Sequence, residues 1–171
     1  MALNYDYTAG LFDGEGSFIV TLSQRKRKAG STSIALYMWV SIGQSHANGK
    51  DLIEQVVEFL KQDGINAYPK TSGNATQLRI VEIESLLKFC ERLSGKLLLK
   101  QEPLENFEMI LRLRQQKNIA LKNRTWSEEL LDFYRTVAII WDTTYRSRFH
   151  EKNYYESKLF AMLEQKGIST Y

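Results

Sequence analysis

Two stretches near the N-terminus alternate apolar and polar side chains, which is the period of a β-strand. Within residues 17–27, every second residue is apolar from Phe18 to Leu22. The same pattern runs from Ile34 to Ile42 within residues 33–44, and Gly30 supplies a turn between the two stretches. The pattern predicts a long hairpin with one buried face and one open face.

The rest of the chain continues with a helix, a second hairpin and further helices. Residues 50–62 place apolar side chains at helical spacing, and Gly64 ends them. Residues 65–72 and 75–81 flank Gly73 as a shorter hairpin. Further helices are expected over residues 82–93, from near Pro103, and over about residues 153–166. Thr125 and Glu128 form a capping box that predicts another helix running to about Trp141. This order predicts an α+β fold, with a four-stranded antiparallel sheet covered by helices on one face.

Length and composition favour one globular domain over residues 1–171, with a core of about residues 4–121 and a C-terminal helical part of about residues 125–168. Cys90 is the only cysteine and the histidines are two, so disulfide frameworks and Cys/His zinc sites are excluded within one chain. Any metal must bind oxygen ligands. The chain has no apolar run long enough to span a membrane and no N-terminal signal pattern. We therefore expect an intracellular protein, in the cytoplasm or an organelle, that is not secreted and has no membrane partner.

Charge is distributed unevenly, although the net charge is only +3. Residues 17–50 and 64–81 contain no acid, and both stretches contribute side chains to the open face of the predicted sheet. An ordinary solvated face is one interpretation, but cations, aromatic rings and hydroxyls on four strands favour a nucleic-acid surface. The residues expected to bind DNA are Thr21, Ser23, Arg25, Arg27, Lys28, Tyr37, Trp39, Ser41, Tyr68, Lys70, Ser72, Gln77 and Arg79, together with Arg146 and Arg148 near the C-terminus.

Three glycines and two acids lie together in the stretch TAGLFDGEGSF, residues 8–18. An EF-hand calcium loop is excluded, because Phe18 and Gln24 occupy the positions that need Gly and a bidentate Glu. A phosphate-binding loop is excluded as well, since no strand precedes the stretch and no GK[ST] follows it. A third interpretation is the end of a helix with incidental acids. Gly10 and Gly14 share one helical face, which permits close approach of another backbone.

The acids fit that third interpretation poorly, because a carboxylate at a helix C-terminus meets the negative end of the macrodipole unless a cation is bound. Residues 8–16, TAGLFDGEG, resemble the motif of the LAGLIDADG homing endonucleases. Thr8 replaces the usual Leu and Glu15 the commoner Asp, although the family admits Glu there. The resemblance implies an αββαββα core whose sheet forms a saddle. The chain contains one copy of the motif, so a homodimer is implied.

The resemblance also implies roles for single residues. Two motif helices would pack side by side through Thr8, Ala9, Gly10, Leu11 and Asp13. Glu15 and the carbonyl of Gly14 would bind Mg²⁺ or Mn²⁺, whereas Ca²⁺ would bind without turnover. Asp13 is expected to be structural rather than a ligand.

Gln44 would order water in the site and Lys100 would stabilise negative charge, so that Glu15, Gln44 and Lys100 form the expected catalytic set. Lys96 competes with Lys100 for its role. His46 and Lys50 cannot be aligned with the basic residue that the family often has near Gln44.

The function implied is that of an intron-encoded, site-specific endonuclease. It would hydrolyse phosphodiester bonds of double-stranded DNA within a long pseudo-palindromic site and leave short 3′ overhangs. An intron-RNA-binding maturase and a cleavage-inactive DNA-binding relative are the alternatives.

Overall fold

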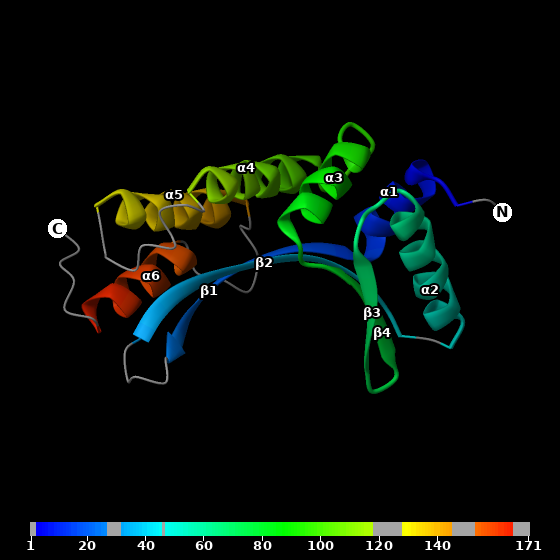
Figure 1. The fold of residues 1–171 in the computed structure, drawn as a ribbon, viewed down its shortest axis with the longest axis horizontal. Coiled ribbons are helices and arrows are strands. Elements are labelled where there is room, and N and C mark those ends of the chain that lie inside the picture. The colour runs from blue at the N-terminus through cyan, green and yellow to red at the C-terminus, as the bar shows by residue number, and fades with distance from the viewer. Residues whose placement is uncertain (1–2, 27–31, 46, 118–127, 145–152, 166–171) are drawn as a thin grey trace. The chain divides into compact units, whose positions relative to one another are not determined.

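The computed structural model describes residues 3–26, 32–45, 47–117, 128–144 and 153–165. Six helices and four strands lie within these ranges (Figure 1). They are, in chain order, α1 (Tyr5–Glu15), β1 (Gly16–Lys26), β2 (Thr32–Gln44), α2 (Ala47–Gln62), β3 (Ala67–Ser72), β4 (Ala75–Ile80), α3 (Ile83–Leu93), α4 (Gln101–Lys117), α5 (Glu128–Thr144) and α6 (Tyr154–Glu164). The predicted α+β fold and the predicted order of elements are confirmed.

A few element boundaries differ from those expected. Helix α2 begins at Ala47, three residues before the start expected at Lys50. Helix α4 begins at Gln101, and Pro103 falls within its first turn, where a missing N–H is tolerated. Thr125, the expected capping residue of α5, lies outside the described residues.

The four strands form one antiparallel sheet in the order β1-β2-β4-β3. Strand β4 pairs with β2, where Leu78 lies opposite Ile42, and with β3, where Arg79 lies opposite Tyr68. Strand β3 is therefore an edge strand, which explains how it accommodates Pro69. The predicted register of buried and open positions is confirmed for β2 and β4, because Val40, Ile42, Leu78 and Ile80 are fully buried.

The chain divides into two compact units, and the division passes through β1 and β2. Unit 1 comprises residues 1–19 and 38–111, and unit 2 comprises residues 20–37 and 112–171. The boundary between a core and a C-terminal part, expected near residues 121–125, stays a prediction.

In unit 1, helix α2 packs against the strands β3 and β4 (Figure 1). Ile53, Val56 and Leu60 are spaced three or four residues apart on one face of α2, and all three are fully buried. That spacing is what the sequence pattern predicted. Burial of such an aliphatic side chain contributes roughly 1.5–3 kcal/mol, so the helix is held by this face rather than by its propensity.

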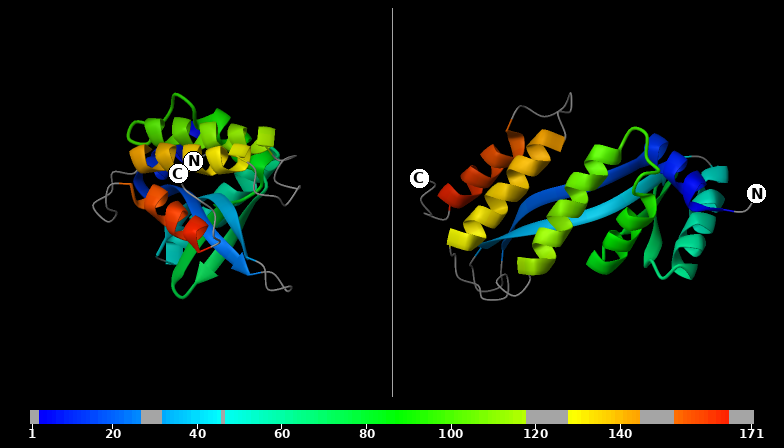
Figure 2. Two further views of the ribbon diagram at one scale, coloured as in Figure 1. Left: turned by 90° about the vertical axis from the view of Figure 1, so that its left-hand side faces the viewer. Right: turned by 90° about the horizontal axis from the view of Figure 1, so that it is seen from above.

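Unit 2 contains α5 and α6, which run side by side (Figure 2). The Tyr134 hydroxyl donates a hydrogen bond of 3.0 Å to the Ile34 carbonyl, which ties α5 to β2 within this unit. The Asp142 carboxylate accepts from the backbone N–H groups of Tyr155 and Glu156 at 2.9 and 3.0 Å. Asp142 thus satisfies the first N–H groups of α6 in place of the local N-cap residue, whose side chain makes no capping bond.

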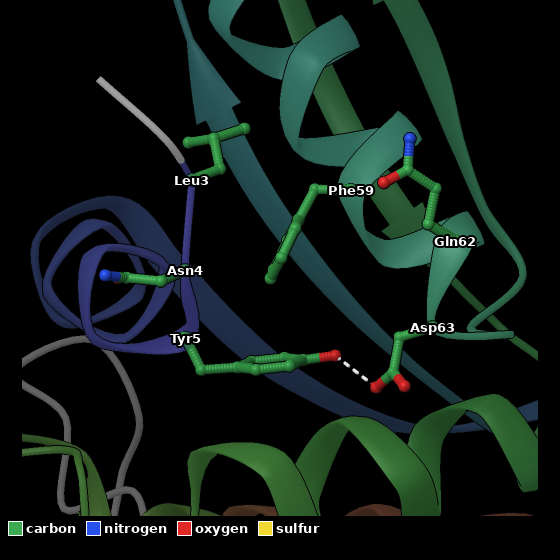
Figure 3. Close-up of a pocket in the computed structure, with 6 residues that line it drawn as sticks. All are labelled: Leu3, Asn4, Tyr5, Phe59, Gln62 and Asp63. Atoms are coloured by element: carbon green, nitrogen blue, oxygen red, sulfur yellow. Dashed lines mark hydrogen bonds between the residues drawn. The ribbon is translucent and has the colours of Figure 1, made fainter.

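Asp63, just after α2, connects three helices of unit 1. Arg92 of α3 donates to both carboxylate oxygens, at 2.7 Å from Nε and 3.0 Å from Nη2. The Tyr5 hydroxyl at the start of α1 donates to Oδ2 at 2.5 Å (Figure 3). Lys88 adds a contact of 3.6 Å to Oδ1 and donates to the Asp63 carbonyl. The hydrogen bond from Arg92, followed by that from Tyr5, lowers the pKa of Asp63 to about 2.

An open depression of about 360 Å³ lies beside this cluster (Figure 3). It is lined by Leu3, Asn4, Tyr5, Phe59, Gln62 and Asp63. The depression lies at the N-terminal end of α1, whereas Glu15 is at the other end, about 15 Å away at 1.5 Å of rise per residue. It is therefore not part of the site that the motif predicts.

None of the helices in the described ranges is long and apolar enough to cross a lipid bilayer.

The Asp63 cluster predicts a dependence of stability on acid. The folded-state pKa of Asp63, about 2, lies below its ordinary value of 3.8. The carboxylate therefore stabilises the fold fully above the ordinary value and loses this contribution as the pH falls towards 2. In urea unfolding, the wild type should exceed Asp63→Asn in stability at pH 6, and the difference should shrink steadily below pH 4. A difference that is constant over this range would contradict the role assigned to the Asp63 charge.

Candidate functional site

The site is built on the C-terminal end of α1, which Phe12 holds in the core of unit 1. The Phe12 side chain is fully buried, with ring centroids 4.7 Å from Phe18 and 5.6 Å from Phe89. Helix α1 ends at Glu15, and the N–H of the following residue, Gly16, donates to the Phe12 carbonyl. A Cβ atom at Gly16 would lie 2.2 Å from the Phe12 ring, so only glycine fits at this position. Phe12 and Gly16 together therefore determine where the helix ends.

Two side chains tie this helix end to the segment before α4. The Asp13 carboxylate accepts the backbone N–H groups of Leu98, Leu99 and Lys100 at 2.6, 3.3 and 3.1 Å. In the opposite direction, the Lys100 ammonium donates to the carbonyls of Phe12 and Asp13 at 2.9 and 2.6 Å. We call these contacts the Asp13–Lys100 tie. The structural part expected for Asp13 agrees with the contacts that its carboxylate makes.

Lys100 lies in an acidic and partly buried environment. Burial lowers the pKa of Lys100, and the charges of Asp13 and Glu15 oppose that shift. The ammonium also lies 5.7 Å from the centroid of the Phe12 ring. Lys96, the competing lysine, instead pairs at 2.5 Å with Asp6 in the first turn of α1. The structure thus places Lys100, and not Lys96, at the end of α1 that carries Glu15.

Glu15 is the last residue of α1, and its side chain is exposed. The carbonyls of Gly14 and Glu15 have no N–H from the helix itself, because the helix ends before residues 18 and 19. A carboxylate and carbonyls without a helical N–H partner form an electronegative set of oxygen atoms at the helix C-terminus, which suits a hard divalent cation. No group of three or more His, Cys, Asp and Glu side chains that could hold a metal occurs in the described part of the chain.

Gln44 lies at the end of β2 and is partly buried, in register with Thr76 of β4. Gly49 in the first turn of α2 lies against it. A Cβ atom at Gly49 would be 2.6 Å from the Cβ atom of Gln44, so the glycine makes room for the Gln44 side chain. Of the other candidates nearby, Lys50 is exposed and pairs with Glu54 at 3.8 Å, and His46 lies outside the described residues.

One face of α1 is exposed and carries little side-chain volume. Gly10 and Gly14 are both exposed, and a Cβ atom at either position would meet no atom within 4 Å. Packing of the chain on itself thus does not require glycine at these positions. The part expected for Thr8 and Ala9 in a dimer interface stays a prediction, and both side chains are buried in the core of their own chain. The reason is geometric: successive helix residues turn by about 100°, so Thr8 and Ala9 share a face with Phe12 rather than with Gly10.

The predicted DNA-binding residues of unit 1 lie on the open face of β2, β3 and β4. Trp39, Ser41, Gln77 and Arg79 are partly exposed, whereas Tyr68, Lys70 and Ser72 are exposed. Arg79 of β4 lies between Ser41 of β2 and Tyr68 of β3, and Gln77 lies between Gly43 and Lys70. These seven predicted residues are thus brought onto neighbouring strands.

The remaining predicted residues fall in unit 2 or outside the described part. Thr21, Ser23 and Tyr37 are partly exposed in unit 2. Arg25 lies in β1, but its side chain is outside the described part, and so are Arg27, Lys28, Arg146 and Arg148. Their role in DNA binding stays a prediction.

Sequence reasoning missed three features that position the site. Gly16 and Gly49 are needed for close contacts with Phe12 and Gln44, but a glycine in a sequence does not reveal which side chain it meets. The segment from Leu98 to Lys100 could not be connected with Asp13, since 85 or more residues separate them.

The fold and the site together define a class of protein, an α+β fold with one motif helix that ends in an exposed acid. The family model described as LAGLIDADG endonuclease matches residues 8–107 of the chain. The chain therefore belongs to the LAGLIDADG endonuclease family. No curated protein matches the chain significantly.

Solved structures show the same fold over nearly the whole chain. The homing endonuclease I-CvuI, in a crystal structure with a DNA target and Mg, has a TM-score of 0.69 at 12% identity and covers 97% of this chain and 96% of its own. The homing endonuclease I-TnaI has a TM-score of 0.65 at 20% identity, with coverages of 96% and 99%. The LAGLIDADG homing endonuclease I-SmaMI, bound to cleaved DNA, has a TM-score of 0.68 at 21% identity, and the match covers 96% of this chain but 49% of that one.

The Asp13–Lys100 tie predicts that Asp13 stabilises unit 1. Asp13→Ala leaves three backbone N–H groups without their acceptor, which should lower the free energy of unfolding by roughly 2–3 kcal/mol. Hydrogen exchange should accelerate at the amides of residues 98–100. The matched control is Asp6→Ala on the same helix, where the Asp6 side chain is 76% exposed, and its loss should cost less than about 1 kcal/mol. Equal effects of the two variants would refute the tie.

Proposed function

We propose that the chain is a site-specific, metal-dependent DNA endonuclease that acts as a homodimer. The observation that carries the proposal is the position of Glu15. Its carboxylate is exposed at the end of α1, beside the Asp13–Lys100 tie and on the same helix as the open positions Gly10 and Gly14. The DNA complex of I-CvuI, which shares this fold, supports a DNA substrate.

Two copies are proposed because one copy supplies one exposed motif acid. The described part of a single chain holds no cluster of acids or histidines that could bind a metal alone. Gly10 and Gly14 leave space beside α1 for a second helix to approach closely. Leu98 and Leu99, which are 90% and 77% exposed, add apolar surface on the segment tied to Asp13. This chain matches about half of the I-SmaMI chain, which is consistent with an I-SmaMI chain that contains two copies of this fold.

In each copy, the Glu15 carboxylate and the Gly14 carbonyl would hold Mg²⁺ or Mn²⁺, for which oxygen ligands at a helix C-terminus are suitable. A bound divalent ion activates water and offsets charge on the oxygens of a phosphodiester. Asp13 is not assigned as a ligand, because its carboxylate oxygens already accept three backbone hydrogen bonds.

Lys100 has one donor left for the substrate. An ammonium group carries three N–H bonds, and the carbonyls of Phe12 and Asp13 take two of them. The third can donate to a phosphate oxygen and stabilise negative charge that develops during cleavage. Gln44, positioned against Gly49, would hold a water molecule through its amide.

The open face of the sheet would lie in the major groove, where polar side chains reach the edges of the bases. With two copies related by a twofold axis, the site read by the protein would be long and pseudo-palindromic. We further propose that the cut leaves short 3′ overhangs and that Ca²⁺ supports binding without turnover.

The first prediction from this proposal concerns Glu15. Incubation of the wild type with a library of double-stranded sites in Mg²⁺ should yield a discrete cleaved sequence. Glu15→Gln keeps the size of the side chain but removes a metal ligand. Substitution of residues that merely support metal ligands lowers activity by up to about 100-fold, so loss of a ligand itself should reduce cleavage of that sequence at least ~100-fold. Binding of the same DNA in Ca²⁺ should be retained.

The control is Glu58→Gln, an exposed glutamate on α2, which should cleave as the wild type does. No cleavage of any site by the wild type, or full activity of Glu15→Gln, would overturn the nuclease assignment. Tight binding of intron RNA in place of DNA would favour a maturase.

The second prediction concerns the dimer. Gly10→Ala places a methyl group in open space within one chain and gains up to about 1 kcal/mol of helix propensity. A partner helix in close contact would clash with that methyl group. Sedimentation equilibrium should therefore show a dimer for the wild type and a weakened dimer for Gly10→Ala, whereas thermal unfolding of the variant's monomer should not be impaired.

Gln55→Ala, at an exposed position of α2, is the control and should leave the dimer intact. A wild type that sediments as a monomer both with and without DNA would contradict the shared site, and so would a Gly10→Ala dimer of unchanged strength.

A further inference from the structure

Trp39, Gln77 and Arg79 form a connected cluster on the open face of unit 1. The guanidinium carbon of Arg79 lies 5.7 Å from the centroid of the Trp39 ring, within the range of a cation–π contact. Its Nη2 group donates a hydrogen bond of 3.2 Å to Oε1 of Gln77, two residues earlier in the strand. One side of the Arg79 group is thus stacked and one donor is tethered, which holds a long side chain in a defined place.

The hydrogen bonds of Arg79 are incomplete within the chain. A guanidinium carries five N–H donors, and Gln77 accepts one of them. The Arg79 Nε atom is buried without an acceptor, and no carboxylate among the described residues pairs with this arginine. The inner edge of the guanidinium, which carries Nε, therefore faces the protein. The donors that remain usable by a ligand are those of the two terminal amino groups.

The neighbours in the sheet leave room for this arrangement. Gly43 lies opposite Gln77, and a Cβ atom at Gly43 would lie 3.6 Å from the Gln77 Cγ atom. Ser41 and Tyr68, which flank Arg79 on the adjacent strands, are neutral. Neither of the two register positions beside the arginine thus holds a counter-ion.

This geometry is better suited to reading a base than to holding a phosphate. Phosphate contacts need charge and reach, and the exposed Lys70 on the edge strand supplies both. Arg79 is partly buried and held by two neighbours, so its planar fork is pre-organised. Two parallel N–H donors in a plane match the N7 and O6 acceptors that guanine presents in the major groove.

We propose that Arg79, held by Trp39 and Gln77, reads one guanine in each half of the DNA site and sets the sequence specificity there. The proposal rests on the proposed function, because it assumes that the open face enters the major groove of DNA. In this assignment Arg79 contacts the base, while Trp39 and Gln77 are positioning residues that hold the fork in the plane of the base pair.

The experiment selects bound sequences from randomised duplexes in Ca²⁺, so that cleavage is not needed. The wild type should enrich guanine at one position in each half-site. Arg79→Lys keeps the charge but loses the fork, and the preference for guanine at that position should fall by roughly 5- to 150-fold while preferences elsewhere persist. Trp39→Leu removes the stacking surface and should weaken the preference at the same position.

Lys70→Gln is the matched control. It should lower affinity for all sequences alike and reduce the salt dependence of binding, without changing the preferred base anywhere. Thermal unfolding of each variant checks that it is folded, and Arg79→Lys and Trp39→Leu address the same position through different side chains.

Two outcomes would overturn this proposal without affecting the proposed function. In the first, the wild type binds DNA, but Arg79→Lys loses no preference for guanine at any position. In the second, Arg79→Lys loses affinity for every sequence equally, which is the result expected if Arg79 contacts a phosphate. If the wild type binds no duplex, the proposed function fails together with this inference.

Discussion

The contacts between Asp13 and Lys100 connect the end of α1 with the segment that precedes α4, and the rest of the site depends on them. Each residue uses its side chain to satisfy backbone groups of the other's segment. A helix C-terminus accumulates unpaired carbonyls and partial negative charge, and a second carboxylate there adds repulsion. The Lys100 ammonium offsets both effects at the carbonyls of Phe12 and Asp13. Glu15, two residues beyond Asp13, can then remain exposed and without a hydrogen-bonding partner among the described residues of its own chain, which is the condition for binding a cation.

The glycines near the site are needed for different physical reasons. Gly16 is required because a Cβ atom would overlap the Phe12 ring, and Gly49 because a Cβ atom would overlap Gln44. Gly10 and Gly14, in contrast, face open space within the chain. A helix accepts the lower propensity of glycine, about 1 kcal/mol per residue, only where something compensates for it. In the proposed dimer, the close approach of the partner helix would supply this compensation for Gly10 and Gly14, so their open surroundings support the dimer more strongly than their spacing alone.

The sequence predicted the fold well because its signals are periodic and local. Alternation identified β1 and β2 and the buried positions on them, and helical spacing identified α2. Local reasoning failed where a partner lies far along the chain. The start of α6 is capped by Asp142, more than ten residues away, and Asp13 meets residues at positions 98–100. The motif alone did not reveal that the turn of the helix directs Thr8 and Ala9 towards the core with Phe12.

Metal binding, dimerisation and DNA binding are linked in the proposed site. Mg²⁺ needs about six oxygen ligands and releases its water reluctantly, and one helix end offers the Glu15 carboxylate and few carbonyls. A second copy adds an equal set, and the phosphates of bound DNA add more. Each component that joins raises the affinity for the others, since the coupling between binding events is reciprocal. Under the proposed function, a free chain should therefore hold the metal weakly, and the hydrolytic site would be complete only where two chains and their DNA target coincide. Such a requirement restricts cleavage to the recognised sequence without any additional regulatory element.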